Sequence, residues 1–364
     1  MIEKRLLEIF LRLLKIDALS QHEQPVAEHI HDFLTALALK PYFDKSKIKT
    51  KSNTGNLLCK VGNGGDVMFL AHMDTARTTR EVKPQILADR ITSDGTSVLG
   101  VDNRAGIAVI LYALEKMLLE KNAIKNFTIA FTTCEESTLA GSLNLEIAAR
   151  IKKCFIFDSS LRPGSFIYSS CGAKNFNVTI KGLAAHSGLA PEKGINSIAI
   201  AAQALSQIKQ GRISERTTVN IGTISGGSAV NVVPETTQVT GEVRSAEKGM
   251  VDETIQAIKA IFLKETAAHG AGLVFEDEWD FKPYHIAAET EIYKDVSAVL
   301  EKAGLTPVPV ASLAGSDANS LNGRGVQAIN LGIGAQNPHA NDEFIYLDDL
   351  AKSSEIALEL MKKE

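Results

Sequence analysis

Continuously apolar strand-like runs alternate with helical segments through residues 1–172, and this alternation restricts the fold more than any other feature of the sequence. Two such runs are FTIAFTT (127–133) and CFIFD (154–158). Strands without a polar face are buried on both sides, as in a parallel sheet covered by helices. Residues 283–364 resume the same pattern. We therefore predict an α/β domain with a mostly parallel sheet flanked by helices.

Residues 173–282 have a different pattern. Their strand-like segments, such as NFNVTIKG and TTQVTGEVRS, alternate apolar and polar residues, which is typical of a sheet with one covered face. The expected order of elements, β-α-β-β-α-β, is that of a ferredoxin-like unit. A chain of 364 residues is also too long for one compact core. The simplest organisation is an α/β domain formed by residues 1–172 and 283–364, with residues 173–282 inserted as an α+β ferredoxin-like lid.

Composition and charge exclude several classes of function. The formal net charge is −4 and no run of Lys and Arg occurs, so no basic face is expected for nucleic acid. In the first 17 residues, apolar side chains recur at helical spacing with charged residues between them. This pattern predicts an amphipathic surface helix and not a secretory signal. No stretch approaches ~18 uninterrupted apolar residues, so no membrane span is expected. The four cysteines form no C-x-x-C pair, which favours buried reduced thiols in a cytoplasmic protein.

Several of the expected strands end in a histidine or a carboxylate. The run MFLAHMDT reaches His72 at its end, and Asp74 lies two residues on, on the same side of an extended chain, where it could orient the imidazole. Asp102 stands just before a helix in LGVDNRAGIAVIL, where a helix cap and a metal ligand are both reasonable interpretations. Glu135 and Glu136 follow an apolar strand; they are either solvated, or one binds a metal ion and the other acts as a general base.

Two further motifs complete the set. Asp158 ends the strand CFIFD, and His339 follows the strand INLGI in NPHANDEF. Singly, each of these residues has an ordinary structural explanation, but together they fall at the carboxyl ends of strands, where open α/β sheets place their sites. Two histidines and three carboxylates suit zinc, and Co²⁺ or Mn²⁺ would be tolerated. With two divalent ions and a bridging hydroxide the cluster would be neutral, so its burial would cost little in desolvation.

The order of motifs from about residue 5 to residue 362 resembles that of a known enzyme family. In sequence they are AHMDT, GVDNRAGIA, EES followed by GS, FDSS, AAHSGLAPEKG, NVVP followed by GEVRS, AGSDAN and NPHANDE. This order is similar to that of the aminoacylase, carboxypeptidase and peptidase T family of di-zinc hydrolases, and most similar to its peptidase T-like group. The resemblance implies two zinc ions per chain and the insertion architecture described above.

The resemblance also implies roles for individual residues. It gives two zinc ions five ligands: His72 and Asp158 for one ion, Glu136 and His339 for the other, and Asp102 bridging both. It makes Glu135 the catalytic base and Asp74 the support of His72. In the inserted domain, His186 matches a histidine that helps stabilise the oxyanion, often from a neighbouring subunit. Substrate contacts are implied for Asn231, Arg244, Gly315, Ser316 and Asp317, of which Asn231 and Arg244 would hold the substrate carboxylate.

The expected function is hydrolysis of short peptides, by an aminopeptidase acting on tripeptides or similar substrates. A metal-bridged water would attack the carbonyl, with Glu135 as general base. An N-acyl amino acid deacylase or a carboxypeptidase would use the same site. A non-catalytic binding protein would be marked by loss of a ligand or of Glu135, and none is lost. A serine hydrolase would need a G-x-S-x-G elbow, which the sequence lacks.

The expected partners are a short peptide and a second copy of the chain. Exposed strand edges of a ferredoxin-like unit favour pairing of two lids, so we expect a homodimer through residues 173–282. His186 would then act either in its own chain's site or in the neighbouring one. No nucleic-acid or membrane partner is expected.

Overall fold

The computed structural model describes residues 2–363, which divide into two compact units. Unit 1 comprises Met1–Ser169, His285–Ala311 and Ser316–Glu364, and unit 2 comprises Ser170–Tyr284 and Ser312–Gly315. The short segment at 312–315 assigns the Gly315 backbone to unit 2 and leaves the helix that follows it in unit 1.

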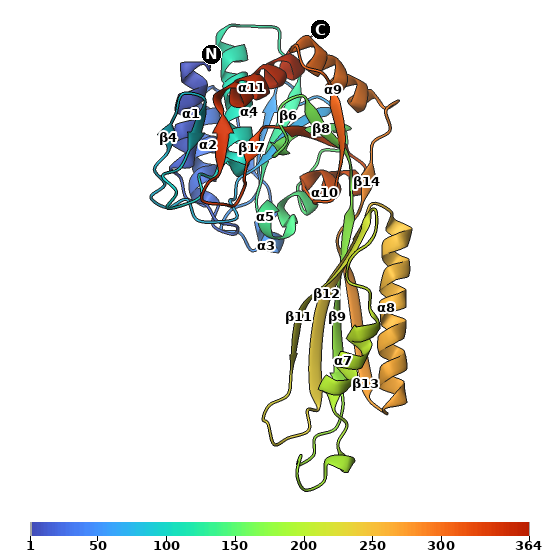
Figure 1. Cartoon of the computed structure of the whole chain (residues 1–364). Helices are drawn as coiled ribbons and strands as arrows, with labels where there is room; N and C mark the ends of the chain where they lie inside the picture. The colour runs from blue at the N-terminus through green and yellow to red at the C-terminus, as the bar shows by residue number, and fades with distance from the viewer. Residues whose placement is uncertain (1, 364) are drawn as a thin grey trace. The chain divides into compact units, whose positions relative to one another are not determined.

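The central sheet of unit 1 has nine strands in the order β1-β2-β6-β3-β7-β16-β8-β14, with β15 beside β8. Figure 1 labels β6, β8 and β14 of this sheet. The bounds are β1 Tyr42–Phe43, β2 Leu57–Val61, β3 Val67–His72, β6 Phe127–Thr132, β7 Lys153–Ser159, β8 Ser165–Ser170, β14 Tyr284–His285, β15 Val308–Ser312 and β16 Gln327–Gly332. The four strands at its centre, β6, β3, β7 and β16, are parallel, and every residue of β6 is buried. The prediction of a parallel sheet from the continuously apolar runs is therefore confirmed, and it brings the carboxyl ends of these strands to one edge.

Residues GNGGD (62–66) lie between two strands and have the composition of a hairpin turn, but they do not form one. Strand β6 lies between β2 and β3 and is hydrogen-bonded to both, so the turn joins strands that are not neighbours. The turn instead lies against Asn126, just before β6. A Cβ on Gly65 would come within 1.9 Å of the Asn126 carbonyl oxygen, so this position requires glycine.

Helices surround the central sheet. Their bounds are α1 Lys4–Leu14, α2 Gln24–Ala36, α4 Val101–Leu119, α9 Glu291–Lys302 and α11 Leu347–Met361, with short helices α3 Lys47–Thr50, α5 Glu135–Thr138, α6 Ala140–Leu143 and α10 Asp317–Gly323. A small second sheet is ordered β17-β18-β5-β4, with bounds β17 Ala335–Gln336, β18 Phe344–Tyr346, β5 Arg90–Thr92 and β4 Gln85–Ile86. As predicted, α1 is amphipathic and turns its apolar face, with Phe10 and Leu13, inward.

Helix α4 is the most deeply buried helix of unit 1 and packs directly on the central sheet. Its side chains are buried along almost its whole length, and it contacts β3, β7, α1 and α11. Gly106 lies in its second turn, where a Cβ would come within 2.0 Å of the Phe157 carbonyl oxygen. The absence of a side chain therefore lets the start of α4 approach the end of β7 closely, and this approach brings Asp102 near Asp158.

Unit 2 is a ferredoxin-like unit with one additional strand. Its antiparallel sheet is ordered β10-β11-β12-β9-β13, with bounds β9 Gly172–Lys181, β10 Gly211–Ser214, β11 Thr217–Gly226, β12 Thr236–Ser245 and β13 Gly272–Phe281. Helices α7 (Ser197–Gln207) and α8 (Lys248–Ala268) share one core with the apolar face of this sheet, and a single 3₁₀ turn spans Pro191–Lys193. The predicted β-α-β-β-α-β order is present, whereas the short strand β10 was not expected.

Two expectations about the chain as a whole can be compared with the structure. No helix within residues 2–363 is long and apolar enough to cross a membrane. All four cysteines are buried free thiols, as predicted.

Candidate metal centre

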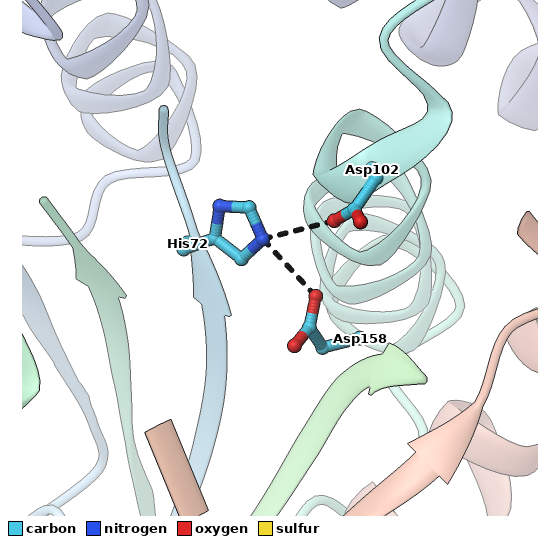
Figure 2. A group of neighbouring side chains, drawn as sticks. All are labelled: His72, Asp102 and Asp158. Carbon is cyan, nitrogen blue, oxygen red and sulfur yellow. Dashed lines mark hydrogen bonds and ion pairs between the residues drawn. The ribbon is translucent and has the colours of Figure 1, made fainter. Parts of the chain in front are cut away.

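The ends of β3 and β7 and the start of α4 bring three of the predicted ligands together (Figure 2). The His72 Nε2 atom lies 3.0 Å from Asp102 Oδ1 and 3.1 Å from Asp158 Oδ1. The two carboxylates point at the same imidazole nitrogen from different elements (Figure 2). Asp158 Oδ1 is buried and makes no contact with hydrogen-bond geometry. Burying an ionised oxygen without such a partner is costly, so this atom is suited to binding a cation.

A second group shares one member with the first. The His339 Nε2 atom lies 3.0 Å from Glu136 Oε2 and 3.6 Å from Asp102 Oδ2. Asp102 thus directs one carboxylate oxygen towards each histidine. This is the arrangement required of a carboxylate that bridges two metal ions, and within each group the potential ligand atoms lie no more than 4.8 Å apart.

The donor set fits the implied ions. Imidazole and carboxylate ligands bind zinc at about 2.0–2.2 Å and also accept other divalent metals. Each group offers three protein ligands and leaves a position for water or substrate, as catalytic sites do. Two divalent cations would neutralise the carboxylates that the fold gathers at this edge.

Burial and mutual contacts shift the pKa values of the two histidines. Burial alone would lower the pKa of His72, but the carboxylates of Asp158 and Glu135 raise it well above its usual value. Hydrogen bonds to Asp102 and Glu136 raise the pKa of His339 to about 10. In the metal-free protein both imidazoles therefore hold a proton where the metal ions would bind.

Glu135 belongs to neither ligand group. Its carboxylate lies 3.9 Å from His72 Nε2, next to the first group. Burial, together with the charges of Asp158 and Asp317, raises the pKa of Glu135 well above its usual value, although His72 acts in the opposite direction. A buried carboxylate with a raised pKa, close to the metal ligands but free of them, is suited to accept and return a proton.

Asp74 contacts both its predicted partner and the two glutamates. His72 Nδ1 lies 3.1 Å from the Asp74 carbonyl oxygen and 3.4 Å from its carboxylate. The same carboxylate accepts hydrogen bonds from the backbone N–H groups of Glu135 and Glu136, at 3.0 and 3.1 Å, and from the Ser20 hydroxyl. Asp74 is fully buried and holds the segment that carries Glu135 and Glu136.

The predicted substrate loop at Gly315, Ser316 and Asp317 has a mainly internal geometry. Ser316 caps α10, and Gly315 lies so close to the Phe281 ring that a Cβ would come within 2.5 Å of it. Asp317 is buried and accepts a 2.6 Å hydrogen bond from Thr132. Burial raises the pKa of Asp317 to about 6, although hydrogen bonds from Ser142 and Thr132 lower it. The charge of the buried Asp317 helps to raise the pKa of Glu135, and the predicted contact of Asp317 with substrate would need a rearrangement of α10.

The three residues predicted in the inserted domain all lie in unit 2. The His186 ring is exposed, and its Nδ1 accepts hydrogen bonds from the backbone N–H groups of Gly188 and Leu189 at 3.2 and 3.3 Å. That tautomer leaves Nε2–H as an outward donor. Asn231 lies beside His186, since its carbonyl oxygen accepts a hydrogen bond from the Ser187 N–H.

Arg244 is not free to bind an anion as it stands. Its guanidinium donates to both carboxylate oxygens of Glu242, at 2.9 and 3.1 Å, and lies over the Phe281 ring. A substrate carboxylate would have to replace Glu242 in this pair.

Two charged residues near the ligands were missed in the sequence. Arg104 is fully buried and donates hydrogen bonds to the carbonyl oxygens of Met73, between His72 and Asp74, and of Ile16. Glu343 is also buried, and it accepts hydrogen bonds from backbone N–H groups around Asp102. Arg104 lies in the motif GVDNRAGIA and Glu343 in NPHANDEF. A charged residue so close to a predicted ligand was the signal in the sequence that could have identified each of them.

The fold and the paired ligand groups define a metal-dependent hydrolase with an inserted ferredoxin-like unit. Comparison with known proteins agrees. Residues 168–270 match the model of the M20 peptidase dimerisation domain. The chain is 31% identical to the uncharacterised protein YqjE of Bacillus subtilis over 99% of this chain and 98% of that protein.

Solved structures extend the comparison. The aminopeptidase PepT of Bacillus cereus is 30% identical, with a TM-score of 0.90 over 99% of this chain and 98% of that one. A tripeptidase of Staphylococcus aureus is 27% identical, with a TM-score of 0.92 over 100% and 98% of the two chains. The chain belongs to the peptidase T-like group of the M20 family of peptidases.

Metal binding should release protons. Histidine binds metal as the neutral imidazole, so the protons held by His72 and His339 must leave. Because the pKa of His339 is raised to about 10, the cost of deprotonation falls as pH rises, and apparent metal affinity should increase from pH 6 towards pH 9. Calorimetric zinc titrations in buffers of different ionisation enthalpy measure the release, which should be smaller for His339→Ala. A pH-independent affinity without proton release would contradict the pKa shifts.

Proposed function

We propose that this protein is a di-zinc aminopeptidase that removes the first residue of tripeptides or similar short peptides. The observation that carries the proposal is the Asp102 carboxylate, which directs one oxygen towards His72 and the other towards His339. Glu135 lies beside His72 but belongs to neither ligand group. When bound, two zinc ions would lower the pKa of a shared water and polarise the scissile carbonyl. His72, Asp102, Glu136, Asp158 and His339 would hold these ions.

The side chains of the protein supply the remaining steps. Glu135 takes the proton of the attacking water and returns it to the leaving amine, which its raised pKa favours. The His186 Nε2–H donates to the oxyanion. Asn231 and Arg244 hold the substrate carboxylate after Glu242 yields its place, since the planar guanidinium binds a carboxylate through two parallel hydrogen bonds. Gly315, Ser316 and Asp317 line the substrate loop once α10 has shifted.

Two relatives with at least 27% identity are described as an aminopeptidase and a tripeptidase, which supports cleavage of short peptides from the N-terminus. Deacylation of N-acyl amino acids or carboxypeptidase action would use the same ligands, but no contact in the described residues favours either reaction over aminopeptidase action. We place the reaction in the cytoplasm on the basis of the four buried free thiols.

Separate replacement of the adjacent residues Glu135 and Glu136 by glutamine tests the mechanism. Glu135→Gln should bind two zinc ions with normal affinity but lose about 10³-fold or more in kcat on a tripeptide, because the proton acceptor is gone. Glu136→Gln, the matched neighbour, should lose activity together with one zinc ion. Metal quantification and steady-state kinetics distinguish the two. Near-normal turnover by Glu135→Gln would remove this residue from its role.

We also propose a homodimer formed through residues 173–282. The described part of β10 pairs only with Thr217–Val219, so the remainder of β11 forms a free edge that carries the exposed Ile224. Pairing of two such edges would satisfy their backbone groups. The match of residues 168–270 to a dimerisation domain supports this assembly. In the dimer, His186 would serve the partner's site.

Mixing inactive variants tests the shared site. A His186→Ala chain paired with a Glu135→Gln chain forms one site that lacks both residues and one that has both, so part of the activity should return. As a control, a His186→Ala chain paired with a chain that carries both His186→Ala and Glu135→Gln should regain no activity, because neither site then has both residues. If subunit exchange is demonstrated and the first mixture stays inactive, His186 acts within its own chain.

A further inference from the structure

The two ligand groups are supported in different ways. In the first group, His72 and Asp158 lie on neighbouring parallel strands, and their side chains are 2% and 9% exposed. In the second group, His339 lies outside any helix or strand, and its side chain is 49% exposed. An exposed side chain on a loop loses more conformational freedom when it binds a metal ion than a side chain already fixed in a sheet. The second group therefore depends on whatever holds the segment that carries His339.

Glu343 connects this segment to Asp102. Glu343 is 1% exposed, and its carboxylate accepts hydrogen bonds from the backbone N–H of Gly100 at 2.6 Å and of Asp102 at 3.1 Å. Within α4, Asn103 Oδ1 accepts a hydrogen bond from the Gly106 N–H at 3.0 Å, whereas Glu343 binds the N–H groups that precede Asn103. The carboxylate thus fixes the turn from which the bridging ligand projects, although it is 241 residues away in sequence.

Additional contacts hold the same segment from the side of β3. Arg77, three residues after Asp74, donates hydrogen bonds to the His339 carbonyl oxygen at 3.1 Å and to Asn341 Oδ1 at 2.9 Å. Ser93 donates to the Asn341 carbonyl oxygen at 2.9 Å. Residues 339–343 are therefore attached at both ends: at His339 through Arg77, and at Glu343 through the backbone of Asp102.

We propose that Glu343 is a positioning residue that determines the affinity of the second metal ion, the one held by Glu136, Asp102 and His339. It fixes two of these three ligands relative to each other, because its own backbone follows His339 by four residues while its carboxylate holds the Asp102 backbone. The first ion also uses Asp102, but its other two ligands, His72 and Asp158, are positioned by the sheet and do not involve Glu343. The inference rests on the proposed di-metal site and adds that its two halves have separable affinities.

The test is a zinc titration of the metal-free protein monitored by calorimetry. Metal content is also quantified after dialysis against increasing concentrations of a chelator. Glu343→Gln keeps the shape of the side chain but places an amide N–H₂ against a backbone N–H. It should lower the affinity for the second zinc ion by about 10–100-fold, the usual range for a residue that orients metal ligands. The affinity for the first ion should change much less. Excess zinc should restore most of kcat, with a raised half-saturating zinc concentration.

Asp342→Asn is the matched control, because Asp342 is the adjacent residue, has the same charge, is exposed, and bonds only Asn337 in the described structure. It should leave both affinities unchanged. His339→Ala sets the reference for complete loss of the second ion, and adding Glu343→Gln to it should have no further effect on zinc binding.

Arg77→Met keeps the test valid if Glu343→Gln does not fold, because Arg77 is exposed and holds the same segment from its other end. It too should weaken the second ion selectively. The inference is overturned if Glu343→Gln binds both ions as the unaltered protein does, if it weakens both equally, or if Asp342→Asn has the same effect. Failure of the unaltered protein to bind two zinc ions would instead refute the proposed function.

Discussion

The Asp102 carboxylate belongs to both candidate ligand groups and links them physically. One of its oxygens faces His72 and the other faces His339. Hydrogen bonds to both histidines lower the pKa of Asp102 against the effect of burial, so the group remains charged. Around this anion the sheet edge adds further carboxylates, and cations bound between them would offset their mutual repulsion in a buried setting. The fold thus gathers a set of side chains suited to hold metal.

Several features far apart in the sequence keep Asp102 in place. The lack of a side chain at Gly106 lets α4 rest on the end of β7, near Asp158. Glu343 holds the backbone at the start of α4, and Asp74 holds the segment of Glu135 and Glu136 in the same manner, through backbone N–H groups. Two buried carboxylates outside both candidate ligand groups thereby orient the residues proposed to bind metal or to accept the proton. In the proposed site, only some of the acidic residues would then face each ion.

The sequence predicted those parts of the fold that depend on local periodicity. Continuous apolar runs indicated the parallel centre, and alternating runs indicated the ferredoxin-like unit. The close approach of the candidate ligands was predictable because strand ends in such a sheet meet at one edge. The insertion of β6 between the two strands that GNGGD connects was not predictable. Strand order depends on which segment fills the space beside β3, and β6 follows β3 by about sixty residues in the sequence. Glu343 and Arg104 were missed for a similar reason: their partners are backbone atoms brought near only by the tertiary fold. The pairing of Arg244 with Glu242 also needs the strand geometry, which places both on one face of β12.

Diffraction from crystals of the zinc-loaded protein, recorded on both sides of the zinc absorption edge, would locate the metal ions themselves. We expect two anomalous peaks, one among His72, Asp102 and Asp158 and one among Glu136, Asp102 and His339, with Asp102 contacting both. A single peak at full loading, or peaks away from Asp102, would contradict this expectation.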